Sequence, residues 1–310
     1  MNFLKYFNGL LSNVFSKNEN VYVYGQNVAT GSCLSGLTRN LELTKSSKIA
    51  NSPNSENSLV GIGFGAMLRG IHAVFCMKQQ DFLLLGIDHL VNTNNIMRNE
   101  TVNGSFTIIS IIEDGGYEGP QSALNNFSDF ASIARIDCYS ITNNIDAKAI
   151  IGNKMLSPGF KIIGISQRLL SQSLIEISLL KNDDHLNYFQ YKDGNDVTII
   201  CYNFSLPYGL EIVERFKEKG FSASLFSINT FISFDYSAII EDVSKTKNII
   251  IIDDSKSCNL SCYELINSIQ DKYKLENKRI IKRDYSSDYF YPRSDVLDID
   301  YENIVTSFFK

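Results

Sequence analysis

The 310-residue chain has no excess of basic residues, no C-x-x-C pair and no apolar run long enough to span a membrane. Its formal net charge of -5 at pH 7 excludes a general nucleic-acid binder, because such proteins carry a basic patch or stripe. The start of the chain lacks the basic segment, continuous apolar core and small-residue cleavage site of a secretion signal. We therefore expect a cytoplasmic protein that binds neither nucleic acid nor a membrane.

Residues that commonly bind metals are few and are not spaced for a metal site. The 6 cysteines and 3 histidines include no zinc-finger arrangement, so we expect reduced cysteines in the core and no zinc. His72 falls at the start of a predicted strand and His89 on a predicted helix. We expect both of these histidines to be structural.

What the sequence does contain is an alternation of continuous apolar runs and amphipathic segments, which indicates an α/β protein. The strands predicted in the first half are Val21–Tyr24, His72–Cys76, Thr107–Ile112, Cys138–Thr142 and Phe160–Ser166. The helices predicted there are Met1–Val14, Leu59–Leu68, Phe82–Asn95, Ser128–Ala134 and Asp146–Lys154. Strands and helices that alternate in this way are typical of a doubly wound parallel sheet.

The length and one polar segment predict two domains. A chain of 310 residues is long enough for two domains of about 150 residues each. Residues 181–196 are polar and rich in turn-forming residues, which predicts a linker between domains at 1–180 and 197–310. The second domain is expected to be a smaller α/β unit. Its predicted strands are Val197–Tyr202, Ser222–Ile228, Asn248–Asp253 and Arg279–Lys282. Its predicted helices are Leu210–Lys219 and Cys262–Tyr273.

Several segments, taken in order, carry a resemblance to a known family. The first is Ser52–Met67, which reads S-P-N-S-E-N-S-L-V-G-I-G-F-G-A-M. The others are Asp81-Phe82 followed by Ile87–Asn92, the Gly-rich segment Gly115–Ser122, and Asp193–Ile199. As a set they resemble the β-subunits of 2-oxo-acid dehydrogenase E1 components and their transketolase relatives. The resemblance implies a pyrimidine-binding domain followed by a transketolase C-terminal-like domain, with thiamine diphosphate bound between two chains.

The resemblance also implies a partner. In this family an α-type subunit carries a G-D-G motif that holds Mg²⁺ and the diphosphate, and the expected assembly is α2β2. The segment Lys192–Asn195 contains Asp-Gly but lacks the first glycine of that motif and lies in the predicted linker. We therefore expect no metal ligand in this chain, and Mg²⁺ bound mainly by the partner.

Glu56 is the residue to which the resemblance assigns the main catalytic role. It matches the family glutamate that hydrogen-bonds the aminopyrimidine ring, which then deprotonates the reactive carbon of the thiazolium ring. Without the family pattern, Glu56 would be an acidic residue in the first turn of a helix, where it is favoured by the helix dipole. The two interpretations predict different effects of substitution.

Phe82 matches the aromatic residue that packs on the pyrimidine ring of the cofactor in this family. The alternative is an ordinary core phenylalanine, since the chain contains 20 of them. Gly61, Gly63 and Gly65 form a G-x-G-x-G pattern, but they lie inside an apolar helical run. We therefore expect them to permit close helix packing and not to bind a dinucleotide.

The chain departs from the family at two places near the expected cofactor. Gln26 and Asn27 stand where relatives usually have acidic residues. In the predicted substrate loop, which includes Tyr117, Gln121 stands about where relatives have a histidine. An amide can orient a substrate by hydrogen bonding but cannot transfer protons near neutral pH as a histidine does. Farther along the chain, Asp253–Ser255 ends an apolar strand, and we expect interface or capping roles there.

Three functions remain open. The first is a β-type subunit of a two-chain thiamine-diphosphate enzyme that transfers a two-carbon unit from a 2-oxo acid or ketose to an aldehyde or keto sugar. The second is the E1 β-subunit of a lipoyl-linked 2-oxo-acid dehydrogenase. The third is a non-catalytic interaction subunit. The absence of the loop histidine favours the first over the second, and the presence of both Glu56 and Phe82 argues against the third.

Overall fold

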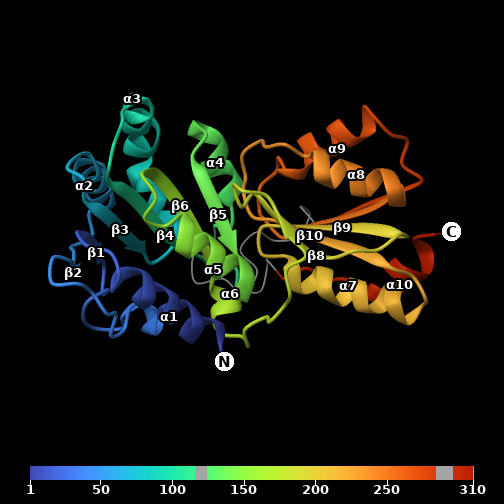
Figure 1. Cartoon of the computed structure of the whole chain (residues 1–310), viewed down its shortest axis with the longest axis horizontal. Helices are drawn as coiled ribbons and strands as arrows, with labels where there is room; N and C mark the ends of the chain where they lie inside the picture. Colours follow the sequence, from blue (N-terminus) through green and yellow to red (C-terminus); the bar gives the residue numbers. More distant parts are fainter. Residues whose placement is uncertain (116–123, 284–295, 310) are drawn as a thin grey trace.

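The computed structural model describes residues 1–115, 124–283 and 296–309. Within these ranges the chain forms two α/β units that lie side by side, each built on a six-stranded sheet (Figure 1). The first sheet is wholly parallel and the second is mixed. The predicted fold class is confirmed. No helix among the described residues is long and apolar enough to cross a membrane.

The first sheet has the strand order β2-β1-β3-β4-β6-β5. Its strands are β1 (Val21–Gly25), β2 (Lys48–Asn51), β3 (His72–Met77), β4 (Ser105–Ile112), β5 (Asp137–Ile141) and β6 (Gly159–Ser166). The helices of this unit are α1 (Phe3–Phe15), η1 (Leu34–Gly36), α2 (Glu56–Leu68), α4 (Phe127–Ala134), α5 (Asn144–Asn153) and α6 (Gln167–Leu170). All five strands predicted for this half are present, and β2 is a strand that the sequence did not predict.

Helices cover both faces of the first sheet, because alternate residues of each buried strand point to opposite sides. On β3, for example, Val74 packs in the same cluster as α1 and α5, whereas Phe75 packs with α2 and α4. Every residue of β4 is buried, as expected for a central parallel strand. The amphipathic start of the chain forms α1, whose first turn is capped by Asn2.

The segment predicted as one helix at Phe82–Asn95 is irregular. It consists of the 3₁₀ segment η2 (Gln80–Gly86), the π-helical turn η3 (His89–Thr93) and the short helix α3 (Asn94–Met97). Gly86 packs so closely on α2 that an added Cβ would come within 2.7 Å of the Val60 side chain. Buried side chains of Gln80 and Asp81 also bond to the chain near Leu124. These tertiary contacts override the helical periodicity of the sequence.

The second sheet has the order β12-β11-β9-β10-β8-β7. Its strands are β7 (Lys181–Asn182), β8 (Tyr188–Lys192), β9 (Val197–Tyr202), β10 (Ala223–Ile228), β11 (Asn248–Asp253) and β12 (Asn277–Lys282). Its helices are α7 (Leu206–Glu218), α8 (Ser237–Thr246), α9 (Cys262–Gln270) and α10 (Tyr301–Ser307). Residues 181–196, expected as a linker, therefore contribute β7 and β8 to the antiparallel side of this sheet.

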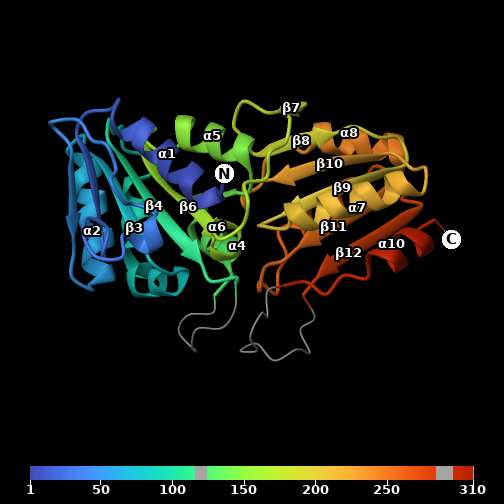
Figure 2. The same ribbon diagram turned by 90° about the horizontal axis from the view of Figure 1, so that it is seen from below.

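The two units share part of their core. Helices α7 and α10 lie on one face of the second sheet and α8 and α9 on the other (Figure 1). Buried residues of α7 belong to the same apolar cluster as α1 and α5 of the first unit. In the view from below, α5 lies beside β7 and β8 (Figure 2), and the Asn143 amide before α5 donates to the Tyr191 hydroxyl at 2.6 Å. The contact between the units is thus both apolar and polar.

Candidate functional site

The strands β2, β1, β3 and β4 are neighbours and parallel, so their carboxyl ends meet at one edge of the first sheet. The residues predicted for the site all follow these strand ends: Gln26, Asn27, Glu56, Phe82, Tyr117 and Gln121. Tyr117 and Gln121 lie outside the described residues. Open α/β sheets bind their ligands at the carboxyl edge. The topology therefore brings the described members of the predicted set to the edge where a ligand is expected.

Glu56 is the first residue of α2 and is half-buried. Two contacts fix this turn of the helix: the buried Tyr24 hydroxyl of β1 donates to the Leu59 carbonyl at 2.8 Å, and Gly86 of η2 lies against Val60. The carboxylate of Glu56 forms no hydrogen bond or ion pair with the described residues. It is thus a positioned carboxylate at the amino end of a helix with no partner in the described part of the chain.

Phe82 lies on η2, next to α2. Its ring is half-buried and packs against the apolar cluster formed by α2, α4 and the facing strands. The close contact of Gly86 with Val60 holds η2 against the first half of α2. The structure therefore brings the elements that carry Glu56 and Phe82 together, on the α2 face of the carboxyl edge.

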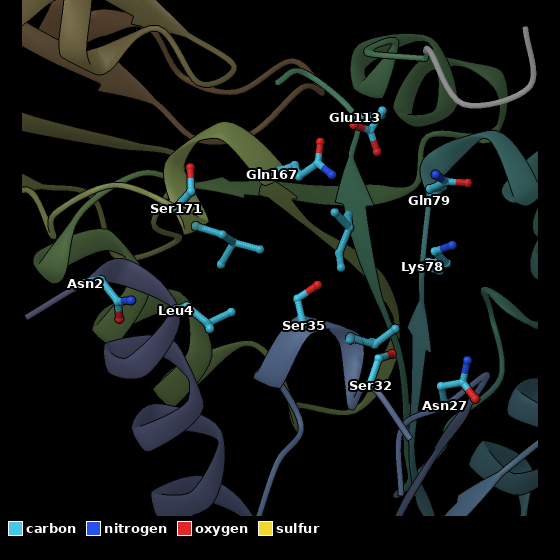
Figure 3. Close-up of a pocket in the computed structure, with 13 residues that line it drawn as sticks. Asn2, Leu4, Asn27, Ser32, Ser35, Lys78, Gln79, Glu113, Gln167 and Ser171 are labelled. Atoms are coloured by element: carbon cyan, nitrogen blue, oxygen red, sulfur yellow. The ribbon is translucent and has the colours of Figure 1, made fainter. Parts of the chain in front are cut away.

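A cavity of about 530 Å³ opens at the same edge, on the α1 face (Figure 3). This volume is within the usual range for small-molecule sites. Its lining is rich in amide and hydroxyl groups and includes Asn2, Asn27, Ser32, Ser35, Gln79 and Gln167. Asn27 is exposed and has a φ of 56°, in the left-handed region that asparagine tolerates better than most residues. Gln26, Glu56 and Phe82 do not line this cavity. Of the predicted site residues, Asn27 therefore lies at the cavity on the α1 face of the sheet, whereas Glu56 and Phe82 lie on elements of the α2 face.

The cavity contains polar residues that the sequence interpretation missed. Glu113 directly follows β4 and is only 2 % exposed, and Gln79 follows β3 and is 4 % exposed. Gln167 follows β6 in the same way. The signal that identifies these three residues is their position within two residues of the ends of the buried parallel strands β3, β4 and β6.

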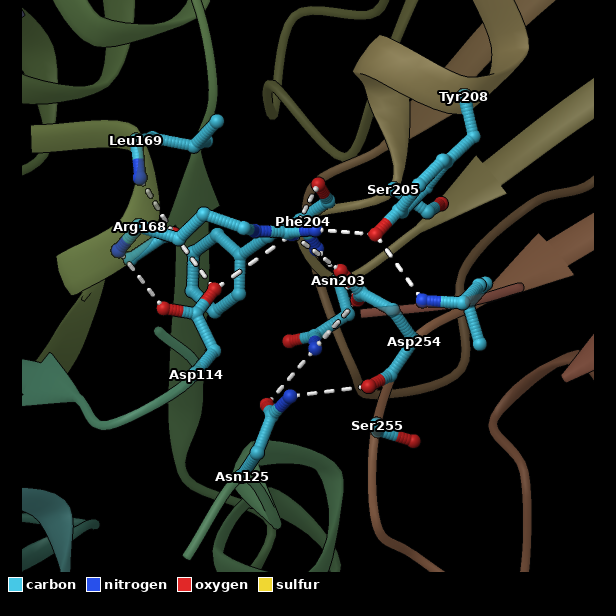
Figure 4. A network of polar contacts seen from close by, with 12 residues as sticks. Asp114, Asn125, Arg168, Leu169, Asn203, Phe204, Ser205, Tyr208, Asp254 and Ser255 are labelled. Atoms are coloured by element: carbon cyan, nitrogen blue, oxygen red, sulfur yellow. Dashed lines mark hydrogen bonds and ion pairs between the residues drawn. The ribbon is translucent and has the colours of Figure 1, made fainter. Parts of the chain in front are cut away.

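A buried ionic network joins the two units next to this edge (Figure 4). The Arg168 guanidinium bridges two carboxylates, at 2.6 Å from Asp254 Oδ2 and 3.5 Å from Asp114 Oδ2. It also lies over the Tyr208 ring, 5.3 Å from the ring centroid. Burial raises the pKa of Asp114, and the nearby Arg168 charge opposes this effect. The predicted interface role of Asp254 is confirmed, while Asp253 accepts the Ser255 N–H at 2.9 Å as a local cap.

A second polar junction joins the two units near the carboxyl ends of β5 and β10. The Asn229 amide, after β10, donates to the Ser140 carbonyl at 2.7 Å and to Asp146 Oδ2 at 3.0 Å. Burial raises the pKa of Asp146 to about 6, although Thr142 and Asn143 also donate to it. This junction has no hydrogen bond to η2 among the described residues.

Comparison with known proteins places these features in a family context. Residues 189–298 match the family described as "Transketolase, C-terminal domain". The chain is 22% identical to the 2-oxoisovalerate dehydrogenase subunit beta of Bacillus subtilis, over 81% of this chain and 79% of that protein. It is 23% identical to the pyruvate dehydrogenase E1 component subunit beta of Cyanidium caldarium, over 82% of this chain and 79% of that protein. The predicted family resemblance is confirmed.

Solved structures show the same fold. A chain described as "Split gene transketolase, inactive beta4 tetramer" superposes with a TM-score of 0.70 and 12% identity, covering 98% of this chain and 97% of that chain. The transketolase of Campylobacter jejuni subsp. jejuni gives a TM-score of 0.65 at 13% identity, over 90% of this chain and 42% of that chain. The region that matches the transketolase C-terminal domain supplies Asn203, Tyr208 and Asp254 to the ionic junction.

Proposed function

We propose that this chain is the β-type subunit of a two-chain thiamine-diphosphate-dependent enzyme that transfers a two-carbon unit from a 2-oxo acid or ketose to an aldehyde or keto-sugar acceptor. The observation that carries the proposal is Glu56, a half-buried residue at the start of α2 whose carboxylate has no hydrogen-bond or ion-pair partner among the described residues. A half-buried acidic residue that has no hydrogen-bond or ion-pair partner at the carboxyl edge of an open α/β sheet is more typical of a functional residue than of a structural one.

The residues at the α2 face fit an aminopyrimidine ring. Such a ring needs an acid beside one nitrogen and an apolar surface along its plane. Glu56 offers the acid, and Phe82 on the adjoining η2 segment offers an aromatic face. When bound, thiamine diphosphate supplies a nucleophilic carbon that attacks a carbonyl group. The role of this chain is to orient the ring with Phe82 and to exchange a proton with its nitrogen through the Glu56 carboxylate.

A partner chain is part of the proposal, because the sequence contains no G-D-G motif for Mg²⁺ and the diphosphate. Large apolar side chains support it: Leu84 and Leu85, on the same η2 segment as Phe82, are each more than half exposed. Large apolar side chains that are exposed beside a candidate site are typical of a surface that another chain covers. The similar split-gene transketolase chain is described as an inactive β4 tetramer. We infer an α-type partner that covers this surface in an α2β2 enzyme.

The second candidate is the E1 β-subunit of a lipoyl-linked 2-oxo-acid dehydrogenase. It is favoured by the curated relatives, which are β-subunits of 2-oxoisovalerate and pyruvate dehydrogenases. Gln121 argues against it, because an amide cannot provide the proton transfer that a histidine would provide at that place. The two functions share the cofactor chemistry and differ in the acceptor.

The acceptor distinguishes them experimentally. The chain is co-purified with its α-type partner and supplied with thiamine diphosphate, Mg²⁺ and a panel of 2-oxo acids and ketoses. We expect transfer of a two-carbon unit to aldehyde or keto-sugar acceptors and little acylation of an added lipoyl domain. Faster acylation of the lipoyl domain than transfer to any aldehyde would replace the proposal with the dehydrogenase function. Replacing Gln121 by histidine is the matched variant, and we expect it to increase lipoyl acylation.

A further inference from the structure

Three consecutive residues, Leu124, Asn125 and Asn126, lie between the two units. The backbone N–H of Leu124 donates to both oxygens of the buried Asp81 carboxylate, at 3.2 and 3.3 Å. The backbone N–H of Asn126 donates to Oε1 of the buried Gln80, at 3.0 Å. The outer two residues of the triplet are therefore held by η2, the 3₁₀ segment that carries Phe82.

The middle residue, Asn125, is bonded to the second unit instead (Figure 4). Its Nδ2 donates to the Asp254 carbonyl at 2.9 Å, and its Oδ1 accepts from Asn203 Nδ2 at 2.9 Å. Its carbonyl accepts the N–H of Lys256 at 2.8 Å. The Asn203 amide also donates to Asp254 Oδ1 at 2.9 Å, so the group that receives Asn125 is itself fixed. Asn125 is fully buried, and each of these bonds is shielded from water.

We propose that Asn125 is a positioning residue through which the second unit sets the place of Phe82. The hydrogen bonds from Leu124 to Asp81 and from Asn126 to Gln80 both join η2 to a residue next to Asn125, so a shift of Asn125 is transmitted to Gln80 and Asp81. A 3₁₀ segment has poorer internal hydrogen bonds than an α-helix and depends more on such anchors. The inference rests on the proposed function only where it treats Phe82 as the residue that stacks on the cofactor. The second unit would thus influence the candidate site at the carboxyl edge, although none of the predicted site residues belongs to that unit.

The alternative is that these bonds simply hold the units together. The second junction provides a matched control, because Asn229 is also a fully buried asparagine whose side chain bridges the units. It has no hydrogen bond to η2 among the described residues. Replacing either asparagine by alanine removes a similar set of side-chain bonds, but only Asn125→Ala disturbs the connection to Phe82.

Hydrogen–deuterium exchange of the whole chain tests the coupling without any ligand. We expect amides in residues 80–86 to exchange about tenfold faster in Asn125→Ala than in the wild type, the effect of losing one or two buried hydrogen bonds. In Asn229→Ala, exchange in residues 80–86 should be unchanged. Unchanged exchange in Asn125→Ala, or equal acceleration in both variants, would overturn the proposal. If Asn125→Ala does not fold, Asn203→Ala removes the bond to Asn125 Oδ1 and is judged by the same comparison.

A second measurement links the coupling to the cofactor. In the complex with the partner, Asn125→Ala should raise the Kd for thiamine diphosphate by about fivefold to tenfold while Asn229→Ala leaves it near the wild-type value, since loss of an aromatic contact costs about 1 kcal/mol. Equal affinity in Asn125→Ala and the wild type would refute the link to Phe82. If the wild-type complex binds no thiamine diphosphate, the proposed function fails, and the exchange experiment still decides whether the second unit positions η2.

Discussion

Glu56 is set apart from the buried carboxylates of the chain by its lack of partners. Asp114, Asp146 and Asp254 are each surrounded by hydrogen-bond donors or by Arg168, which offsets the cost of removing their charge from water. The Glu56 carboxylate is half-buried and has no such compensation from the described residues. A ligand or partner chain with a hydrogen-bond donor beside Glu56 would bind to a carboxylate that α2 already holds in position.

Arg168 has the opposite character, since replacing it by a neutral side chain would leave the buried carboxylates of Asp114 and Asp254 without a counter-charge. We expect Arg168→Met to lower the free energy of unfolding by about 3 to 5 kcal/mol, the usual cost of breaking a buried ion pair from one side. Urea unfolding measures this directly. The control is Arg215→Met, which breaks an exposed pair with Glu211 at 2.8 Å and should change the free energy of unfolding far less, because solvent screens that pair. Similar losses in the two variants would contradict the role given to the network.

At the scale of elements, α2 confirms the predicted close packing for Gly61 and Gly63 of the G-x-G-x-G pattern, but not for Gly65. An added Cβ at Gly63 would lie 2.2 Å from the Phe106 ring, and one at Gly61 would lie 2.9 Å from the His89 ring. A Cβ at Gly65 would meet no atom within 4 Å. The same helix thus contains two tightly packed glycines and one that faces open space.

These environments predict opposite effects for one substitution. Gly63→Ala should lower the free energy of unfolding by about 1 to 3 kcal/mol, because Phe106 must move out of a packed core. Gly65→Ala should raise it by up to about 1 kcal/mol, because alanine favours the helix and has space. Thermal or urea unfolding of both variants checks the pair. Destabilisation by Gly65→Ala would indicate that a partner covers this face in the sample used.

Strands with strong sequence patterns were predicted well, and weakly patterned edge strands were not. The buried apolar run of β4 was predicted over Thr107–Ile112, against Ser105–Ile112 in the structure. In contrast, β2 has no fully buried residue, and β7 is two residues long. Such strands are specified by pairing with β1 and β8 more than by their own residues. That is why β2 was missed and why β7 was placed in a linker. The interior strand β8 has buried aromatic residues, and it was placed in the linker because polar, turn-forming residues flank it on both sides.

The site was predicted in part, for a similar reason. Family resemblance identified Glu56 and Phe82, and the topology puts the elements carrying both at the carboxyl edge; their roles remain predictions. The cavity on the α1 face was not predicted, because Glu113, Gln79 and Gln167 come together only when three separate strands are aligned. Asn125 was not predicted either. Its partners, Asn203 and Asp254, are distant in sequence and belong to the other unit.

At the scale of the whole molecule, the two units form a continuous structure joined by shared apolar core and by two polar junctions. The junctions lie beside the carboxyl edge of the first sheet, so the second unit supports the site without contributing a predicted residue to it. Leu84 and Leu85 of η2 are exposed on the segment that carries Phe82. Completion of the site by an α-type partner is the arrangement that the proposal requires.

The most direct test of the account measures cofactor activation by Glu56. The chain is assembled with its α-type partner, Mg²⁺ and thiamine diphosphate, and exchange of the reactive C2 proton of the cofactor is followed by NMR in deuterated water. We predict that Glu56→Gln slows this exchange by at least about 100-fold, the usual contribution of a general acid–base group, while Glu214→Gln on the exposed surface of α7 leaves it unchanged. Wild-type exchange in a Glu56→Gln complex that binds the cofactor would contradict the assignment.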